Sequence, residues 1–313
     1  LKGRSKSTKE PPATLSLAAM PPGFRAYAEK LNQTALSGPE EASEGAIQAG
    51  EITRTGVPIP FCDPAVAGGV VPSSLLRIHT SRCEDLTMEQ AREDTLRLLR
   101  GLQISDPSRI AVVCARRRIL LVLARSGLVD LQGDGDNQRI GRKEVEEILE
   151  TNVVQVDALR DNWPWQEAPR LLVSRPPWLR IKDRFRGHPE GSELRKKLSR
   201  SLRDTTEIDG SKRFTALRGN VNLYRLYIER SLQLVRDGGK IRIIVPDTVL
   251  REKSSVALRK MIVEQNQWVS SWWFPEPQRI FPGTSQGVCV IGVEVGGKTE
   301  MMTSFGPLRT DDI

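Results

Sequence analysis

Apolar positions in the second half of the chain follow two alternating spacings, one typical of helices and the other of strands. Helical spacing covers residues 222–235 and 254–264. Short runs of β-branched and aromatic residues cover 241–245, 269–274 and 287–295. Strands that alternate with helices favour a parallel sheet with crossover helices. Because no helical pattern separates the last two predicted strands, they are expected to form an antiparallel pair at the sheet edge.

The first half repeats this alternation with weaker signals. The predicted helices cover residues 73–78, 87–99, 110–124 and 143–149. The predicted strands end near Cys62 or cover residues 102–104, 153–156 and 171–173. Residues 130–141 form a Gly/Asp-rich loop, and Gly238-Gly239 is the expected C-cap of the helix over 222–235.

The pattern predicts one α/β domain over residues 56–300. A loosely ordered N-terminal arm, rich in Lys, Pro, Ser, Glu and Gly, is expected over residues 1–55. Residues 301–313 are expected to be a tail or the start of a linker. The chain begins with Leu rather than Met, which is compatible with a fragment of a larger protein.

Composition narrows the class of protein. The chain has 38% hydrophobic and 27% charged residues, with no apolar stretch approaching the roughly 20 residues of a membrane helix. A net charge of +8 fits a nucleic-acid phosphate backbone as partner, although a merely basic soluble protein fits equally well. Four cysteines without paired spacing predict a reducing, cytoplasmic setting and argue against structural zinc.

The first candidate site follows the strand that ends near Cys62. In the segment Asp63-Pro64-Ala65-Val66-Ala67-Gly68-Gly69, small residues lie between this strand and a predicted helix. Small residues let a ligand approach the backbone, and a helix N-terminus favours polar groups. A plain Gly-Gly turn explains the same residues, so this segment alone is a weak signal.

Acidic residues follow the next two strands. Asp106 comes two positions after Ile104, and Asp157 follows the strand over 153–156. In nucleoside-binding α/β folds, an acid at the end of the second strand bonds ribose hydroxyls. An acid after the third strand could accept a hydrogen bond from an adenine amino group. Asp106 and Ser108 are equally typical of a helix N-cap, and Asp157 of a solvated loop.

The fourth segment, Arg175-Pro176-Pro177-Trp178, follows the strand over 171–173. Two prolines stiffen the backbone, and a stiff strand end beside an aromatic ring can hold a base. Enzymes that modify a base flip it out of the duplex and need such a pocket. Simple packing is the alternative interpretation.

In this order the four segments resemble the adenine-N6 DNA methyltransferases of restriction-modification and phage-defence systems. Those enzymes carry Asp-Pro-Ala-Cys-Gly-x-Gly, an acid after strand two, Gly-Asp-x-Leu and Asn-Pro-Pro-aromatic. Later segments fit the same order, namely residues 219–227, 238–246, 254–259 and 281–288. The resemblance covers roughly residues 55–297. It implies an α/β, Rossmann-like S-adenosylmethionine-dependent methyltransferase fold with a mostly parallel seven-stranded sheet, an antiparallel edge hairpin and helices on both faces.

The resemblance also implies roles for particular residues. The residues that correspond to the S-adenosylmethionine site are Asp63, Ala65, Ala67, Gly69, Asp106 and Asp157. The residues that correspond to the base pocket and the catalytic motif are Arg175, Pro176, Pro177 and Trp178, with Arg175 at the position of the catalytic asparagine. The implied partners are double-stranded DNA and other proteins of a restriction or defence complex, with no membrane. Family members usually read their target sequence with a separate recognition domain.

Several residues depart from the family pattern. Ala67 replaces a loop glycine, Val66 the cysteine, Ile104 the ribose-binding acid, Val156 a glycine, and Arg175 the catalytic asparagine. The asparagine oxygen accepts a hydrogen bond from the target amine, whereas Arg has five donors and no acceptor. Losing a pre-organised contact of this kind costs about 10²–10³ in rate.

Together these departures predict a catalytically impaired domain that binds DNA or acts as a scaffold. An active adenine-N6 DNA methyltransferase is the first alternative. A nucleoside-binding or methylating enzyme that acts on RNA or protein is the second.

Overall fold

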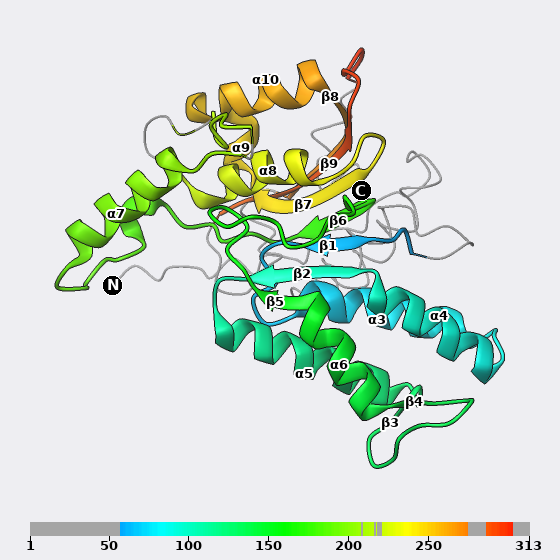
Figure 1. The fold of residues 1–313 in the computed structure, drawn as a ribbon. Helices are drawn as coiled ribbons and strands as arrows, with labels where there is room; N and C mark the ends of the chain where they lie inside the picture. Colours follow the sequence, from blue (N-terminus) through cyan, green and yellow to red (C-terminus); the bar gives the residue numbers. More distant parts are fainter. Residues whose placement is uncertain (1–56, 208, 216, 218–220, 275–285, 303–313) are drawn as a thin grey trace, which may run out of the picture.

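The computed structural model describes residues 57–302, apart from 208, 216, 218–220 and 275–285 (Figure 1). The predicted N-terminal arm and most of the predicted tail lie outside the described residues. So do Gly219 and Asn220, and residues 281–285 of the last family-like segment. Within the described part, no helix is long and apolar enough to cross a membrane.

A seven-stranded sheet forms the centre of the molecule, in the order β5-β2-β1-β6-β7-β9-β8. Its strands are β1 (Phe61–Asp63), β2 (Leu102–Asp106), β5 (Val153–Gln155), β6 (Leu171–Ser174), β7 (Lys240–Pro246), β8 (Asn266–Phe274) and β9 (Val288–Val295). All pairings among β5, β2, β1, β6 and β7 are parallel, whereas β9 runs antiparallel to both β7 and β8. The predicted fold class and antiparallel edge pair are therefore confirmed.

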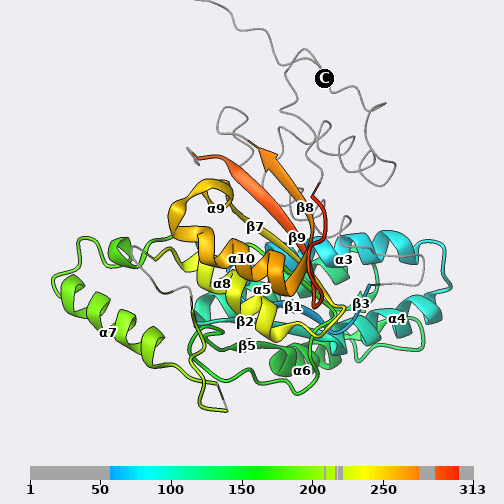
Figure 2. The same cartoon turned by 90° about the horizontal axis from the view of Figure 1, so that it is seen from above.

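Helices cover both faces of this sheet (Figures 1 and 2). One face carries α3 (Val70–Cys83), α4 (Met88–Arg100), α5 (Arg109–Arg125) and α6 (Arg142–Asn152). The other face carries α8 (Leu223–Leu234), α9 (Thr248–Arg251) and α10 (Val256–Gln265). Successive side chains of a strand point to opposite faces. Accordingly, Phe61 belongs to the first core and Cys62 to the second.

Local signals explain where several elements begin. Thr87 and Gln90 form a capping box at the start of α4, in which each side chain accepts from the other's backbone N–H at 3.2 and 3.1 Å. Within the predicted Gly/Asp loop, the two-residue strands β3 (Val129–Asp130) and β4 (Ile140–Gly141) pair in parallel. Short 3-10 turns, η2 (Ile181–Asp183) and η3 (Lys253–Ser255), precede α7 and α10.

The structure corrects three sequence-based expectations. α8 ends at Leu234 with Val235 as its C-cap, so Gly238-Gly239 is not the cap; Gly238, with φ 70°, lies in the turn before β7. β2 continues two residues beyond its predicted end, to Asp106. The helix α7 (Gly191–Asp204) was not predicted, although its leucines recur every four residues.

A third hydrophobic cluster lies beside the carboxyl ends of the parallel strands. It joins Ala65 after β1 and Leu159 after β5 to Leu202 of α7 and Tyr227 of α8. This cluster fixes the segments that follow the strands against α7 and α8. It therefore helps to position the segments after β1 and β5 at this edge of the sheet.

Candidate functional site

The sequence-predicted site residues lie along one edge of the sheet. Because β5, β2, β1 and β6 are neighbouring parallel strands, the segments that follow them meet at the same carboxyl edge. Two hydrogen bonds join these segments directly: Ser174 Oγ donates to Asp63 Oδ1 at 2.8 Å, and Ala67 N donates to Asp106 Oδ2 at 2.9 Å. These bonds connect the segments at the ends of β1, β2 and β6, and the turn that carries Asp157 follows β5 at the same edge.

Asp63 is a buried carboxyl group at the centre of this edge. Its side chain is 1% exposed, and Oδ1 accepts from both Ser174 Oγ and Ala65 N. Oδ2 is buried and has no hydrogen-bond partner among the described residues. Burial raises the pKa of Asp63 to about 7, against the lowering effect of its hydrogen bonds. Asp63 therefore offers an unused acceptor to a donor or cation that enters the site.

The loop after β1 owes its small residues to packing. Gly69 is the N-cap of α3 with φ 81°, and a Cβ there would lie 2.7 Å from the Ala115 Cα of α5. Ala67 also has a positive φ of 46°, which is uncommon for a residue with a side chain. At Gly68 a Cβ would meet nothing within 4 Å. The close approach that requires Gly69 is thus between α3 and α5.

Asp106, not Ile104, is the last residue of β2. Ile104 is fully buried in the first core and pairs in register with Asp63 and Val153. Its prediction as the strand end is therefore wrong. The Asp106 carboxylate accepts from Ser108 N at 2.9 Å and from Ala67 N, and Ser108 itself caps α5. The strand thus ends in an acid that fixes the loop after β1.

Asp157 follows β5 within a tight turn. Its Oδ2 accepts from Arg160 Nε at 2.7 Å, and its Oδ1 accepts from Leu159 N at 3.0 Å. Each oxygen therefore already has one partner from its own segment. An adenine amino group would have to compete with the Arg160 ion pair for this carboxylate.

Two buried arginines donate hydrogen bonds to backbone carbonyls of the turn that carries Asp157. Arg230 Nε donates to Ala158 O at 3.0 Å, and Arg213 Nη1 donates to Asp161 O at 2.8 Å. Both guanidinium groups also donate to Glu207 Oε1, at 2.9 and 2.7 Å. Burial and the neighbouring Arg213 charge lower the pKa of Arg230 to about 10, while Glu207 opposes them. Sequence reasoning missed this cluster because its members are far apart along the chain.

Tyr227 of α8 is a further residue that sequence reasoning did not single out as a site residue. Its side chain is 3% exposed, and burial raises the pKa of its phenol. The carboxylates of Asp157 and Asp106 raise that pKa further, as does Asp63 to a smaller extent. The phenol is therefore within electrostatic range of three sequence-predicted acids.

The segment after β6 is built around Trp178. Its indole Nε1 donates to Ile244 O of β7 at 3.1 Å, and the half-buried ring packs against the cores on both faces of the sheet. The guanidinium carbon of Arg175 lies 5.1 Å from the ring centroid. Burial lowers the pKa of Arg175. The residue at the catalytic position thus lies over a face of the ring that could stack on a base.

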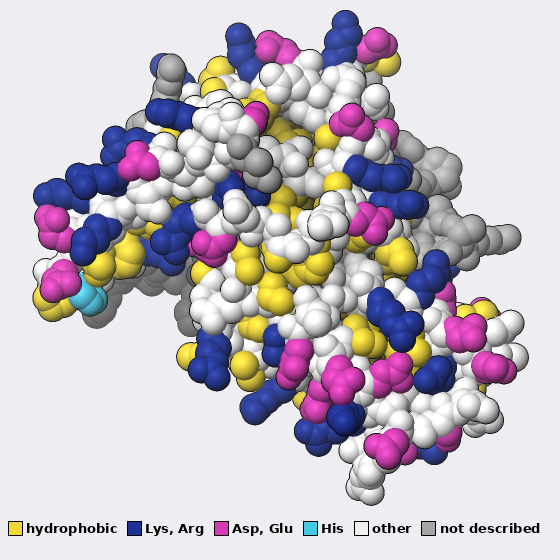
Figure 3. Space-filling model, in the orientation of Figure 1, with side chains coloured by type: hydrophobic (Ala, Val, Ile, Leu, Met, Phe, Trp, Pro, Cys, Tyr) yellow, Lys and Arg dark blue, Asp and Glu magenta, His cyan; other side chains and the backbone are white. Residues whose placement is uncertain are grey.

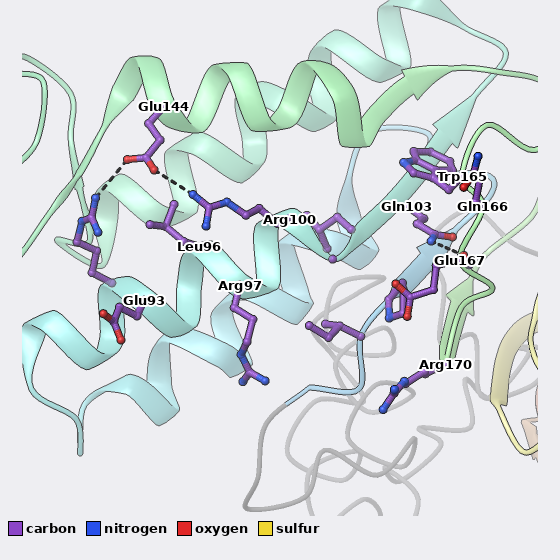
Figure 4. A pocket seen from close by; sticks show the side chains of 15 residues that line it. Glu93, Leu96, Arg97, Arg100, Gln103, Glu144, Trp165, Gln166, Glu167 and Arg170 are labelled. Carbon is purple, nitrogen blue, oxygen red and sulfur yellow. Dashed lines mark hydrogen bonds and ion pairs between the residues drawn. The ribbon is translucent and has the colours of Figure 1, made fainter.

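A cavity of about 1030 Å³ lies at the opposite edge of the sheet (Figure 4). Residues that precede β1, β2 and β6 help to line it, among them Pro60, Gly101 and Arg170. Glu144 pairs there with Arg92 at 3.3 Å and with Arg100 at 3.4 Å. None of the sequence-predicted site residues lines this cavity, so it is distinct from the candidate site.

The sequence of this chain matches one protein family. The profile of the Eco57I restriction-modification methylase family matches residues 104–281, which is more than half of the chain. The chain belongs to this family. The matched range includes β2, the Asp157 turn, the segment after β6, and α8 with β7 and β8. No protein of curated function matches the sequence.

Solved structures share the fold of this Eco57I-family chain at low sequence identity. A chain from a type I R-M system has 12% identity and a TM-score of 0.52, covering 88% of this chain and 48% of that one. The type IIG restriction endonuclease BpuSI has 15% identity and a TM-score of 0.52, covering 88% and 27%. The ATP-dependent type ISP enzyme LlaBIII, bound to DNA, has 12% identity and a TM-score of 0.50, covering 77% and 17%.

This Eco57I-family chain spans less than half of the length of each of these three proteins. The likenesses establish its fold, a mostly parallel seven-stranded sheet with an antiparallel edge and helices on both faces. The expected fold and the expected family are both confirmed.

Proposed function

We propose that this methyltransferase-like domain binds double-stranded DNA within a restriction-modification or phage-defence system and has lost most of its ability to transfer a methyl group. The observation that carries the proposal is the position of Arg175 over Trp178. Arg175 offers donors where an acceptor is needed, and its cation opposes the positive charge that develops on the attacking nitrogen.

Arg175 also competes with a flipped base for the Trp178 ring. A partly desolvated cation–π contact contributes about 0.5–2 kcal/mol, and a base stacked on an aromatic ring contributes about 1–3 kcal/mol. The two contributions are of similar size. A base that displaces the guanidinium would therefore gain little, which disfavours a flipped adenine at this position.

The cofactor half of the site consists of the loop from Asp63 to Gly69, Asp106 and Asp157. Its residues fit S-adenosylmethionine in part. When bound, that cofactor supplies an activated methyl group. Asp63, with its buried unused acceptor, and Asp106, at the end of β2, would hold its polar groups. Asp157 fits less well, because Arg160 and Leu159 N already occupy its oxygens. We therefore infer weakened cofactor binding.

The unused acceptor of Asp63 also favours one alternative. An active adenine-N6 DNA methyltransferase would need this half of the site intact and would flip its target base into the pocket of Pro176, Pro177 and Trp178. In either case the inferred setting is the cytoplasm, with duplex DNA and other subunits of a restriction or defence complex as partners.

Two measurements separate the alternatives: calorimetry with S-adenosylmethionine, and tritium transfer from the labelled cofactor to unmethylated genomic DNA. We expect a weak heat of binding and no transfer above a no-protein control. Robust transfer that is lost in Trp178→Ala would overturn the impaired assignment. No heat of binding at high cofactor concentration would overturn the active one.

The variant Arg175→Asn adds a sharper test of the same site. We expect it to leave transfer undetected, because the Asp157–Arg160 pair and the left-handed Ala67 remain. Appreciable transfer by this variant would show that the cofactor half is intact and that Arg175 alone blocks the chemistry.

A further inference from the structure

The segment over residues 180–204, here called the basic arm, has an unusual share of the positive charge. It contains nine Lys and Arg residues against four Asp and Glu, a net charge of +5 where the whole chain has +8. The arm consists of η2, a short loop and α7. Figure 3 shows these cations gathered on the part of the surface formed by α7.

Packing does not account for the sequence of α7. Within this fully described helix, Gly191 and Leu202 are the buried residues, and Leu198 packs partly against the third cluster. The opposite side carries exposed cations at Lys196, Lys197, Arg200 and Arg203. A helix that buries so little contributes little to the core. Its charged side is therefore available to a partner.

These cations are weakly engaged within the protein. Among the described residues, the side chains of Lys197 and Arg200 make no hydrogen bond or ion pair, although, after the hydrogen bond from Lys196, both charges lower the pKa of Glu193. Lys196 pairs with Glu193 at 2.9 Å, but both side chains are largely exposed, at 70% and 65%. Exposed pairs of this kind contribute about 0–1 kcal/mol, so an anionic partner could replace this one readily.

The arm lies beside the candidate site. It follows the Arg175–Trp178 segment along the chain, and Arg180 at its start forms a β-bridge with Asn222, the N-cap of α8. Ile181 and Leu202 anchor it in the third cluster, which also contains Ala65 and Leu159. A polyanion held along α7 would therefore lie next to the proposed base pocket.

We propose that the basic arm binds the phosphate backbone of double-stranded DNA beside the Arg175–Trp178 segment. This inference rests on the proposed function, because that function makes duplex DNA the polyanion at this edge. The four exposed cations of α7 span seven residue steps, or about 10 Å of helix. Duplex DNA carries one negative charge per roughly 1.7 Å of its axis, so several phosphates lie within that length. Such contacts fix position without reading sequence.

The test is the salt dependence of duplex binding, measured by fluorescence anisotropy between about 50 and 200 mM salt. The variant Lys197→Gln/Arg200→Gln/Arg203→Gln removes three cations of the arm. We expect the slope of log Kobs against log[salt] to shrink by about 3 and the affinity to fall about tenfold or more. Lys197→Arg, which keeps the charge, should bind like the unaltered protein.

A matched control removes the same charge elsewhere. Arg117→Gln/Arg125→Gln/Lys143→Gln alters three exposed cations on α5 and α6, and should leave the salt slope within about one unit. Circular dichroism confirms that each variant is folded. If the unaltered chain binds duplex DNA and both triple variants weaken binding equally, the arm assignment is wrong while the proposed function stands.

The remaining outcomes are equally decisive. If the unaltered chain does not bind duplex DNA at all, the proposed function fails and the arm assignment fails with it. If an RNA duplex of equal length outcompetes the DNA at matched salt, the arm binds a different nucleic acid and the DNA assignment is overturned.

Discussion

Asp63 ends β1 and Arg175 follows the neighbouring strand β6, yet the two positions differ in the contacts that their side chains make. Asp63 accepts from Ser174 and Ala65, so it links β6 to the loop after β1. Arg175 covers the ring of Trp178, which is itself fixed to β7 by its indole N–H. The Asp63 carboxyl group thus joins two strands of the cofactor half, whereas in the base half (Arg175, Pro176, Pro177 and Trp178) the bond to β7 comes from Trp178.

This difference explains how chemistry can be lost while the fold remains. Replacing the Asp63 carboxyl would disturb hydrogen bonds on which two strands depend. Replacing the residue at position 175 changes what covers the Trp178 ring but leaves the Trp178–Ile244 bond in place. The following variants test this difference between the two positions.

The largest effect is expected in the cofactor half, from Gly69→Ala. The added Cβ would meet the Ala115 backbone at 2.7 Å, and φ is 81°. Left-handed strain and overpacking together should lower the free energy of unfolding by about 3–5 kcal/mol. Urea denaturation measures this effect. Gly68→Ala is the matched control, since its Cβ meets nothing within 4 Å; equal effects for the two variants would refute the packing explanation.

The next largest effect is a pH dependence at Asp63. Its folded pKa of about 7 exceeds the ordinary value near 3.8, so the folded state keeps a proton that the unfolded chain releases. Stability therefore falls as pH rises from the unfolded pKa to the folded pKa, and is flat above it. Between pH 5 and 8 the unaltered protein should lose about 2–3 kcal/mol relative to Asp63→Asn.

Urea unfolding at several pH values measures this loss. Asp63→Asn keeps an oxygen that can accept from Ser174, so the hydrogen bond is not the variable. Asp204→Asn, on the exposed end of α7, controls for the loss of a charge. Parallel pH profiles for the unaltered protein and Asp63→Asn would show that Asp63 is already ionised in the folded protein at pH 5. They would therefore contradict the raised pKa of Asp63.

The smallest effect is expected in the base half. A double-mutant cycle with Arg175→Ala and Trp178→Leu isolates the contact between guanidinium and ring. We expect a coupling energy of about 0.5–1 kcal/mol, measured by urea denaturation. A coupling energy near zero would mean that the Arg175 guanidinium does not cover the Trp178 ring in solution. The ring would then be accessible to a flipped base.

The regular elements could be predicted because their signals are local. Alternating apolar spacing located every strand of the central sheet, and the missing helix before β9 predicted its antiparallel pairing. The family-like order of segments predicted the shared carboxyl edge. α7 was missed although Leu194, Leu198 and Leu202 recur at helical spacing, because charged and polar residues separate them.

The contacts of the site could not be predicted, because they join distant segments. The family comparison aligned Ile104 with an acid, but register with β1 and β5 buries that side chain and carries the strand on to Asp106. The covering of Trp178 by Arg175 depends on side-chain conformation. No spacing in the chain indicates that Arg213 and Arg230 share Glu207.

That shared carboxylate has an electrostatic consequence. Glu207 follows the basic arm by three residues, and its single carboxylate is shared by the two guanidinium groups that donate to carbonyls of the turn after β5. Pulling Glu207 away would leave two like charges facing each other below the surface, which is a costly arrangement. The segment that follows the arm and the turn that carries Asp157 are therefore coupled electrostatically, through one carboxylate shared by two arginines.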